Sequence, residues 1–385
     1  MNPIRILHVF ATLNRGGAET AIMTQYRKID KTKIQFDFIV NDNQDSYHYE
    51  NEVLSMGGRV FRMPRYTMIN FVSYKRAWQN FLKEHAEYKI LHAHYTAPAH
   101  IYFDVAKKLA IRTIAHAHTA AVKKNLKEHV RTIFMSFAIK KSDYLFACTK
   151  DAANYVFGKD IFKKDANRTK IVNNAIDTKQ FVFDEEIRKY ARLKLEGSDL
   201  NISNLSLSDK NIYGHIGRFH PTKNHSFIID IFSEITKIDQ KAILILIGDG
   251  LLKKDIENQV ISLGLSDKVY FLGVRSDIPA LLMSMDLFLF PSLFEGFGIV
   301  LIEAQAIGIP CLISNTIPKD VFLTDLVLSE SLSAPANVWA TKAVQLISTT
   351  STKKTSFPQI IKDAGYDIYD TVKEIEDFYM DLYNR

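Results

Sequence analysis

The stretch Phe288-Leu-Phe-Pro-Ser-Leu-Phe-Glu295-Gly-Phe-Gly298-Ile-Val-Leu-Ile-Glu303-Ala-Gln-Ala306 joins two apolar runs through a turn that carries glycines. The run before the turn has the character of a buried strand, and the run after it has that of a helix. The first turn of a helix offers unpaired backbone N–H groups and a positive dipole end to an anion. Glu295 precedes this turn and Glu303 lies just inside the helix. The pattern therefore predicts a site for a phosphorylated ligand with hydroxyl groups on both sides.

Short apolar runs alternate with helical patterns along the rest of the chain. Such alternation indicates βαβ units with parallel, doubly wound α/β sheets, whose ligands bind at the carboxyl ends of the strands. The expected strands of the first half are 4–10, 36–40, 59–63, 90–94, 113–118, 144–148 and 171–173, and those of the second half are 212–216, 242–247, 269–272, 287–290 and 310–314.

The length of 385 residues exceeds one ordinary hydrophobic core, so two domains are expected. We expect a first doubly wound domain over 1–185 and a second over 211–365. Residues 186–210 lose the apolar periodicity and read as a linker or surface segment. An amphipathic helix expected at about 366–385 is a candidate to pack back on the first domain.

The composition is that of a soluble globular chain, with 47% hydrophobic and 24% charged residues. Cys148 and Cys311 lie in separate apolar runs, which indicates buried thiols in a reducing compartment. The run Ile4–Phe10 is too short for a signal peptide, and no apolar run approaches the ~20 residues that span a bilayer. We therefore expect a cytoplasmic protein.

The charge is unevenly distributed. Residues 1–180 hold 29 Lys and Arg against 16 Asp and Glu, whereas the remainder holds 20 against 27. A basic first half suits anionic lipid or a phosphate-bearing substrate, and a scattered solvated surface is the alternative. The segment 121–141 mixes cations with large apolar residues, so it is expected either to lie on an anionic membrane or to pack on the sheet with a basic outer face.

Polar loops follow several expected strands. Gly16-Gly17 stands between a strand and a helix, as in a phosphate cradle, although a plain turn is the alternative and neither the G-x-G-x-x-G nor the P-loop pattern is present. Arg218 and Lys223, five residues apart in another strand-to-helix loop, can reach one diphosphate unless this is an ordinary surface loop.

Two His-x-His pairs, His92/His94 and His116/His118, stand at expected strand ends. Alternate residues on a strand share a face, so the pairs could hold a metal ion, although no acid or cysteine accompanies them. Structural histidines and substrate contact are the other readings. Substrate contact is favoured, with His118, the nearest to the loop, as the preferred candidate.

These motifs together resemble a known family, the retaining glycosyltransferases of the two-Rossmann GT-B fold, group 4 class. The residues that carry the resemblance are Glu295–Glu303 (an E-x7-E motif), Gly217-Arg218-x4-Lys223, Gly16-Gly17, His118 and Asn174-Ala-Ile-Asp177. The resemblance covers nearly the whole chain. It implies an acceptor-side first domain and a nucleotide-sugar donor domain that face each other across a cleft.

Two further segments, Lys223-Asn-His225 and Ile317-Pro-Lys-Asp-Val321, look more narrowly like transferases of bacterial capsular and exopolysaccharide assembly. Two positions depart from the usual pattern. Ala175 stands where glycine is common, and Val300 stands where proline is frequent. Neither is an expected charge contact, although the first leaves the turn at 174–177 undefined.

The resemblance implies a role for each candidate residue. Glu303 would accept hydrogen bonds from ribose hydroxyls, and Glu295 would bind hydroxyls of the transferred sugar. Arg218 and Lys223 would hold the diphosphate and stabilise the charge that grows on it. The remaining expected contacts are Gly298, Ile299, Gly16, Gly17 and Gly248 around the diphosphate, Val274 near the base, and His118 at the sugar.

Retention at the anomeric carbon and a UDP-sugar donor are implied by the same resemblance, with a glycan, expectedly lipid-linked, as acceptor. Glu295 is expected to bind the sugar, although a paired acid could also act as nucleophile. No D-x-D carboxylate pair is present, so transfer without a metal cofactor is expected. The rival readings are a nucleotide-sugar epimerase or hydrolase and a catalytically silent nucleotide-sugar-binding protein; no nucleic-acid-binding motif is found.

Overall fold

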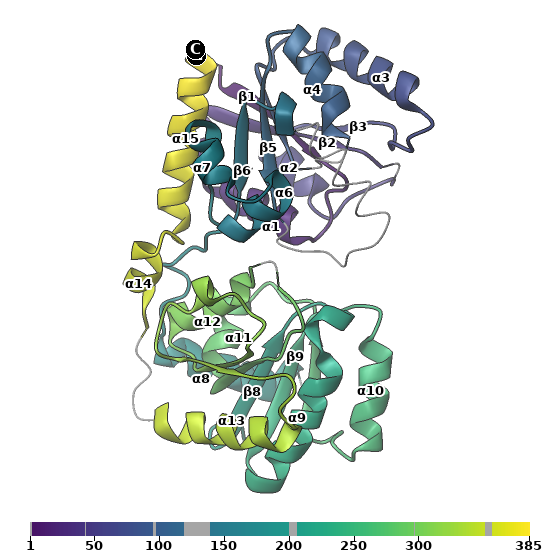
Figure 1. Ribbon diagram of the computed structural model, residues 1–385. Helices are drawn as coiled ribbons and strands as arrows, with labels where there is room; N and C mark the ends of the chain where they lie inside the picture. Colours follow the sequence, from purple (N-terminus) through teal and green to yellow (C-terminus); the bar gives the residue numbers. More distant parts are fainter. Residues whose placement is uncertain are drawn as a thin grey trace. The chain divides into compact units, whose positions relative to one another are not determined.

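A computed structural model describes residues 2–42, 44–94, 98–118, 139–199, 206–295, 297–350 and 356–385. The chain divides into two compact units. Unit 1 comprises Met1–Ala175 and Asp367–Arg385, and unit 2 comprises Ile176–Tyr366. Each unit has its own parallel sheet with helices on both faces, so the doubly wound α/β architecture expected from the sequence is confirmed (Figure 1).

The sheet of unit 1 has seven strands in the order β3-β2-β1-β4-β5-β6-β7. The chain runs outward from β1 in one direction through β2 and β3, and in the other from β4 to β7. The adjacent strands β1 and β4 therefore form the switch point, where ligands of doubly wound sheets bind at the carboxyl ends. The strands are β1 Ile4–Phe10, β2 Ile34–Val40, β3 Val60–Arg62, β4 Ile90–Ala93, β5 Arg112–Ala117, β6 Tyr144–Ala147 and β7 Thr169–Ile171.

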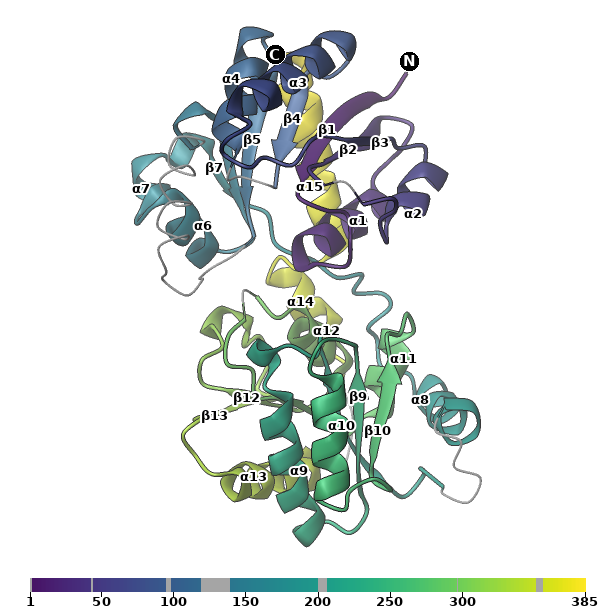
Figure 2. The ribbon, with the colours of Figure 1, turned by 90° about the vertical axis from the view of Figure 1, so that its right-hand side faces the viewer.

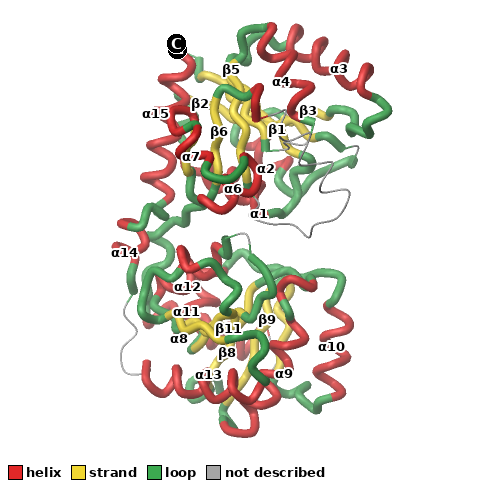
Figure 3. Tube along the Cα trace, in the orientation of Figure 1, coloured by secondary structure: helices red, strands yellow, loops and turns green. Residues whose placement is uncertain are grey.

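Helices cover both faces of this sheet (Figure 3). One face packs around Trp78 and Tyr102, and the other around Tyr26 and the C-terminal Tyr379. The C-terminal helix α15 therefore belongs to unit 1, where it lies against α1 and the sheet. The helices are α1 Gly17–Lys28, α2 Glu50–Ser55, α3 Phe71–Glu84, α4 Ala99–Lys108, α6 Lys150–Phe157, α7 Ile161–Lys164, the 3-10 turn Ala166–Arg168 and α15 Ile368–Asn384.

The sheet of unit 2 has six strands in the order β10-β9-β8-β11-β12-β13, with its switch point between β8 and β11. The strands are β8 Asn211–Ile216, β9 Ala242–Ile247, β10 Val269–Gly273, β11 Leu287–Phe290, β12 Cys311–Ser314 and β13 Val327–Glu330. Buried residues of β9, Ile243, Ile245 and Ile247, face one core, and Leu244 and Leu246 face the other. Strands buried on both faces explain the continuous apolar runs of the sequence.

The helices of unit 2 also lie on both faces, and α9 and α10 run side by side on one of them (Figure 2). They are α8 Glu185–Lys194, a π-helical turn Leu195–Asp199, the 3-10 turn Pro221–Lys223, α9 His225–Ile238, α10 Lys253–Ser262, α11 Ile278–Ser284, α12 Ile299–Ile307, the 3-10 turn Lys319–Val321, α13 Ala336–Thr350 and α14 Pro358–Asp363.

The segment read as a linker begins with an ordered helix. The Asp184 carboxylate caps α8 by accepting from two backbone N–H groups. Arg188 and Arg192 of this helix donate to the Asp286 carboxylate at 2.7 and 2.6 Å. Arg192 is buried on this helix, so α8 is anchored by arginines as well as by its apolar residues.

The basic segment expected at 121–141 lies outside the described residues up to position 138, so the two readings of it stay expectations. Within the described ranges, no helix combines the length and apolarity that a membrane crossing requires.

Candidate functional site

The loops that follow β8 and β11 meet at the switch point of unit 2. Lys223 donates to Glu295 Oε1 at 2.6 Å, and the side chains are 20% and 9% exposed. The Lys223 ammonium also lies 5.1 Å from the centre of the Phe290 ring. Two residues predicted from separate motifs are thus brought into direct contact.

Backbone contacts hold these two loops together. Leu293 N–H donates to Thr222 O at 2.8 Å, and the Asn224 side-chain amide donates to Pro291 O at 3.1 Å. Asn224 adopts a left-handed conformation (φ 59°) that begins α9. The Lys223–Glu295 ion pair therefore joins two loops that are also linked to each other by hydrogen bonds to the backbone.

Gly248, directly after β9, lies against the loop that follows β8. It has φ +139°, and a Cβ placed there would lie 2.1 Å from Gly217 O. Phe219 N–H donates to Asp249 O at 2.9 Å, which links the same two loops. Glycine is required here because the backbones after β8 and β9 pass in direct contact.

The helix α12 follows directly after Gly298, which has φ 78°, and none of the described side chains caps its first N–H groups. Glu303 lies one turn further along and is half-buried. Burial raises the pKa of Glu303 from its ordinary value of 4.5 to about 7. None of the described residues forms a hydrogen bond or ion pair with the Glu303 carboxyl group that would lower its pKa again. An acid of this kind can accept hydrogen bonds from hydroxyl groups.

Arg218 and Val274 occupy exposed positions after β8 and β10. Arg218 makes no ion pair or hydrogen bond with any described residue, and Val274 is 56% exposed. Both follow strands of the half-sheet that contains Gly248. All predicted residues of unit 2 therefore lie in loops at strand carboxyl ends or in the first turns of α12.

Gly16, Gly17 and His118 lie in unit 1, again after strands. Gly16 begins α1 without a side-chain cap. The Glu19 carboxylate lies against the N-terminus of α1, since a Cβ on Gly16 would come within 2.2 Å of its Oε2. The sequence pattern did not identify Glu19 as a candidate. Burial raises the pKa of Glu19. The only signal in the sequence was an acid three residues after a glycine helix start.

Five histidines of unit 1 gather on the sheet face that α15 covers. His8 Nδ1 lies 3.0 Å from His94 Nε2, and His94 Nδ1 lies 2.8 Å from His118 Nε2. His92 Nε2 lies 3.1 Å from His116 Nδ1. His8, a single histidine in an apolar strand, was not anticipated, although its pairing opposite His92 in the parallel register explains why it joins the cluster.

A metal ion was one reading of these histidines. Two sets of three, His8/His92/His94 and His94/His116/His118, have ring nitrogens within 4.8 Å of one another. A tetrahedral zinc ion with bonds of ~2.0–2.1 Å separates its ligand nitrogens by about 3.3 Å. The adjacent nitrogens here are closer, at 2.8–3.1 Å, a spacing that suits hydrogen bonds between neutral rings.

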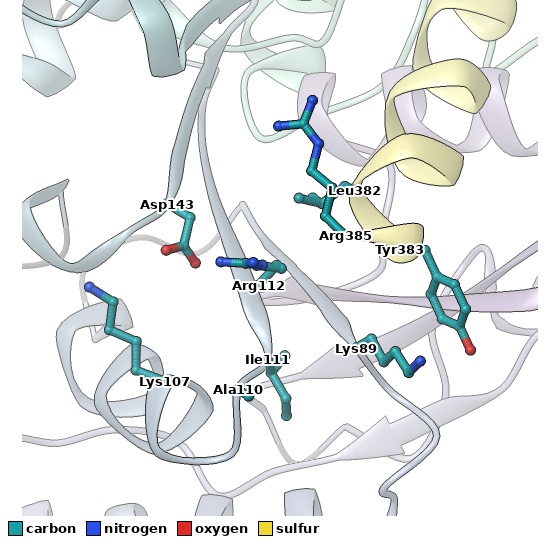
Figure 4. Close-up of a pocket in the computed structure, with 9 residues that line it drawn as sticks. All are labelled: Lys89, Lys107, Ala110, Ile111, Arg112, Asp143, Leu382, Tyr383 and Arg385. Carbon is teal, nitrogen blue, oxygen red and sulfur yellow. The ribbon is translucent and has the colours of Figure 1, made fainter.

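A separate pocket of about 440 Å³ lies at the opposite edge of the unit 1 sheet (Figure 4). Arg112 starts β5 and Lys89 precedes β4, so the pocket is at the amino ends of the strands. It contains none of the predicted site residues. Four of its nine lining residues are basic, and the lining comprises Lys89, Lys107, Ala110, Ile111, Arg112, Asp143, Leu382, Tyr383 and Arg385.

Comparison with known proteins gives two family matches. Residues 15–180 match Glycosyltransferase Family 4, and residues 199–334 match Glycosyl transferases group 1. EpsF of Bacillus subtilis, which bears the name of a glycosyltransferase, is 34% identical over 97% of this chain and 96% of its own length. An Escherichia coli UDP-Gal:alpha-D-GlcNAc-diphosphoundecaprenol alpha-1,3-galactosyltransferase is 26% identical over 77% of this chain and 76% of its own length.

Solved structures agree on the fold. HepE of Anabaena, crystallised with UDP and glucose, superposes with a TM-score of 0.75 at 18% identity, covering 98% of this chain and 99% of that one. A glycosyltransferase from Rickettsia africae reaches 0.76 at 14% identity, covering 100% and 99%. With two doubly wound units, a match to EpsF over almost its whole length and both family matches, this chain belongs to the group 4 glycosyltransferases of the GT-B fold.

Proposed function

We propose that this enzyme transfers a sugar, with retention of configuration, from a UDP-sugar to a hydroxyl group of a lipid-linked glycan in the assembly of a capsular polysaccharide or exopolysaccharide. The observation that carries the proposal is the Lys223–Glu295 pair at the switch point of unit 2. A lysine held beside a carboxylate presents a cation to a diphosphate and an acceptor to sugar hydroxyls. The names of the Escherichia coli relative and of the HepE complex support the acceptor class and the donor.

Each predicted site residue has a proposed role toward the donor. Arg218, exposed and unpartnered among the described residues, and Lys223 would hold the diphosphate, with the uncapped N–H groups at Gly298 and Ile299. Gly248 would leave room for it, Val274 would contact the base, and Glu303 would receive the ribose hydroxyls. The proposal assigns the Gly16-Gly17 helix start to the diphosphate and His118 to the sugar.

Glu295 would bind the sugar and not attack it. Its carboxylate is already engaged by Lys223 and is 9% exposed on its side chain, so it is held in place and its charge is neutralised. In the proposed step the acceptor oxygen bonds to the anomeric carbon as the bond to the diphosphate oxygen breaks. The acceptor proton passes to that leaving oxygen, on the same face of the sugar.

Arg218, Lys223 and the N-terminus of α12 would take the place of a divalent ion at the diphosphate. The chelator EDTA should therefore leave the transfer rate unchanged. A rate that falls with EDTA and recovers with added Mg²⁺ or Mn²⁺ would contradict metal-independent transfer.

An exposed apolar patch supports contact with a membrane. Met68, Ile69, Phe71 and Val72, before and at the start of α3, are 58%, 96%, 41% and 71% exposed. Basic residues flank them, namely Arg65, Lys75 and Arg76. Large apolar side chains beside cations suit the interface of an anionic lipid surface. We assign this patch to the inner face of the cell membrane, where a lipid-linked acceptor would be reached.

Sedimentation with vesicles that contain anionic phospholipid tests this assignment. Ile69→Asp should abolish binding at low salt, whereas Leu251→Asp, at a 95% exposed position of unit 2, should not. Equal binding by both variants, or no binding by the wild-type protein, would refute the membrane contact.

A thermal-shift screen of nucleotide sugars tests the donor, because a ligand that binds the native state raises its melting temperature according to its affinity. UDP-sugars should give the largest shifts. The transfer assay then uses the donor found. Free monosaccharide or epimerised donor without acceptor product would favour a hydrolase or epimerase, and donor binding without any turnover would favour a silent binding protein.

A further inference from the structure

Five histidines of unit 1, together with Tyr379, form two separate chains of hydrogen bonds. One runs His8–His94–His118, and the other runs His116–His92 and continues to the Tyr379 hydroxyl at 2.6 Å from His92 Nδ1. The first chain ends at the residue assigned to the sugar. Its two outer nitrogens, His8 Nε2 and His118 Nδ1, are buried and have no hydrogen-bond partner among the described residues.

Proton counting restricts this chain to two states. A neutral imidazole carries one N–H and one bare nitrogen, so His94 must donate at one nitrogen and accept at the other. In one state His8 donates to His94 and His94 donates to His118, so the remaining N–H lies on His118 Nδ1. In the other state His118 donates to His94 and His94 donates to His8, so the remaining N–H lies on His8 Nε2. One outer nitrogen therefore carries a hydrogen and the other is bare.

The surroundings of the two ends differ. His8 is fully enclosed, and its ring lies against Phe36 and Phe38 with centroid distances of 4.2 and 5.5 Å. None of the described residues offers an oxygen to an N–H at His8 Nε2, and an aromatic ring is only a weak acceptor. His118 is half-buried and follows β5 at the carboxyl edge of the sheet, where a ligand oxygen can accept. A buried N–H without an acceptor costs more than a bare nitrogen, so the hydrogen belongs at His118 once a ligand oxygen lies beside its Nδ1.

We propose that His8 and His94 act as positioning residues that fix His118 in the Nδ1–H tautomer, so that His118 donates a hydrogen bond to an oxygen of the bound ligand. That this oxygen is a sugar hydroxyl rests on the proposed function; the tautomer does not. Burial lowers the pKa of His8 and of His118 to about 3, which keeps both ends of the chain neutral. Among the described residues no acceptor lies beyond the His8 end, so the chain of hydrogen bonds sets a tautomer and does not conduct protons.

Nitrogen-15 NMR of the full chain labelled in histidine measures the tautomer directly. The His118 signals, assigned by their loss in His118→Gln, should show a protonated Nδ1 and a bare Nε2 when the nucleotide sugar found by thermal shift is bound. His94→Phe should release His118 to populate both tautomers and should lower kcat about tenfold, the size expected for one mispaired hydrogen bond, with little change in donor KM.

Tyr379→Phe is the matched control, because it removes a hydroxyl from the second chain and preserves the packing of α15. It should leave the His118 tautomer and kcat unchanged. A bare Nδ1 or an imidazolium at His118 in the wild-type protein would overturn the proposal, as would one zinc ion per chain whose removal changes these signals. If the tautomer is as stated but no donor supports transfer, the proposed function fails while the tautomer assignment stands.

Discussion

Glu303 is the residue whose protonation should control donor binding. Its pKa of about 7 means that the carboxyl group of the free enzyme is about half-protonated at neutral pH. Hydroxyl groups of a ribose would donate to the ionised form, which lowers that pKa on binding. Donor affinity should therefore rise from pH 6 to pH 8, with proton release near pH 7.

Calorimetric titration in two buffers of different ionisation enthalpy measures this proton release. Glu303→Gln should bind the donor more weakly and without pH dependence over that range. Proton uptake on binding, or an unchanged pH profile in the variant, would contradict the ribose contact.

The raised pKa of Glu303 also predicts how the free energy of unfolding depends on pH. Its pKa rises from 4.5 to about 7 on folding, so the native state binds more protons between these values and stability falls as pH rises through them. The fall contributed by Glu303 is at most about 3 kcal/mol. Urea unfolding at pH 4.5 and pH 8 should show that Glu303→Gln loses less stability than the wild-type protein across this interval.

The Lys223–Glu295 pair should be energetically coupled. Removing either partner leaves a mostly buried charge unpaired, so Glu295→Gln and Lys223→Met should each cost about 1–3 kcal/mol, and the double variant should cost less than their sum. Denaturant unfolding of the four proteins measures the coupling. Simple additivity would show that the contact at 2.6 Å contributes nothing.

At the scale of elements, the close passage of the loops after β8 and β9 is the feature to test. Gly248→Ala adds both a strained φ and a contact of 2.1 Å with Gly217 O. It should cost about 2–4 kcal/mol and weaken donor binding. Gly264→Ala is matched, with φ +67° and open space around the added carbon, and should cost only about 1 kcal/mol without loss of binding. Equal effects of the two variants would show that the loops tolerate separation.

The sequence correctly predicted those helices and strands whose limits are set by the local pattern of apolar residues and glycines. β1 has the expected limits Ile4–Phe10, and α12 starts directly after Gly298. It did not predict α8, whose anchor is an arginine pair on Asp286 far along the chain. It also did not predict that His8 would join the histidine chain, because the pairing of β1 with β4 is a property of the sheet order.

At the scale of the molecule, the fold class and the family expected from the E-x7-E stretch are confirmed. The site residues stay predictions, although the structure brings Lys223 to Glu295 as they require. Unit 1 ends its first segment at Ala175 and not at 185, because residues 176–184 and α8 associate with unit 2, whereas α15 lies in unit 1, on which the C-terminal helix was expected to pack. Contacts between segments far apart in sequence decide such limits, and local periodicity does not report them.

The most direct test of the account is the anomeric configuration of the product. The wild-type enzyme should transfer sugar from the UDP-α-sugar identified by thermal shift to a lipid-diphosphate glycan, and NMR of the product should show an α linkage. Lys223→Met should remain folded and lose at least about 100-fold in kcat, because the charge on the leaving diphosphate is no longer stabilised. A β-linked product, or a Lys223→Met enzyme as active as the wild type, would contradict the account.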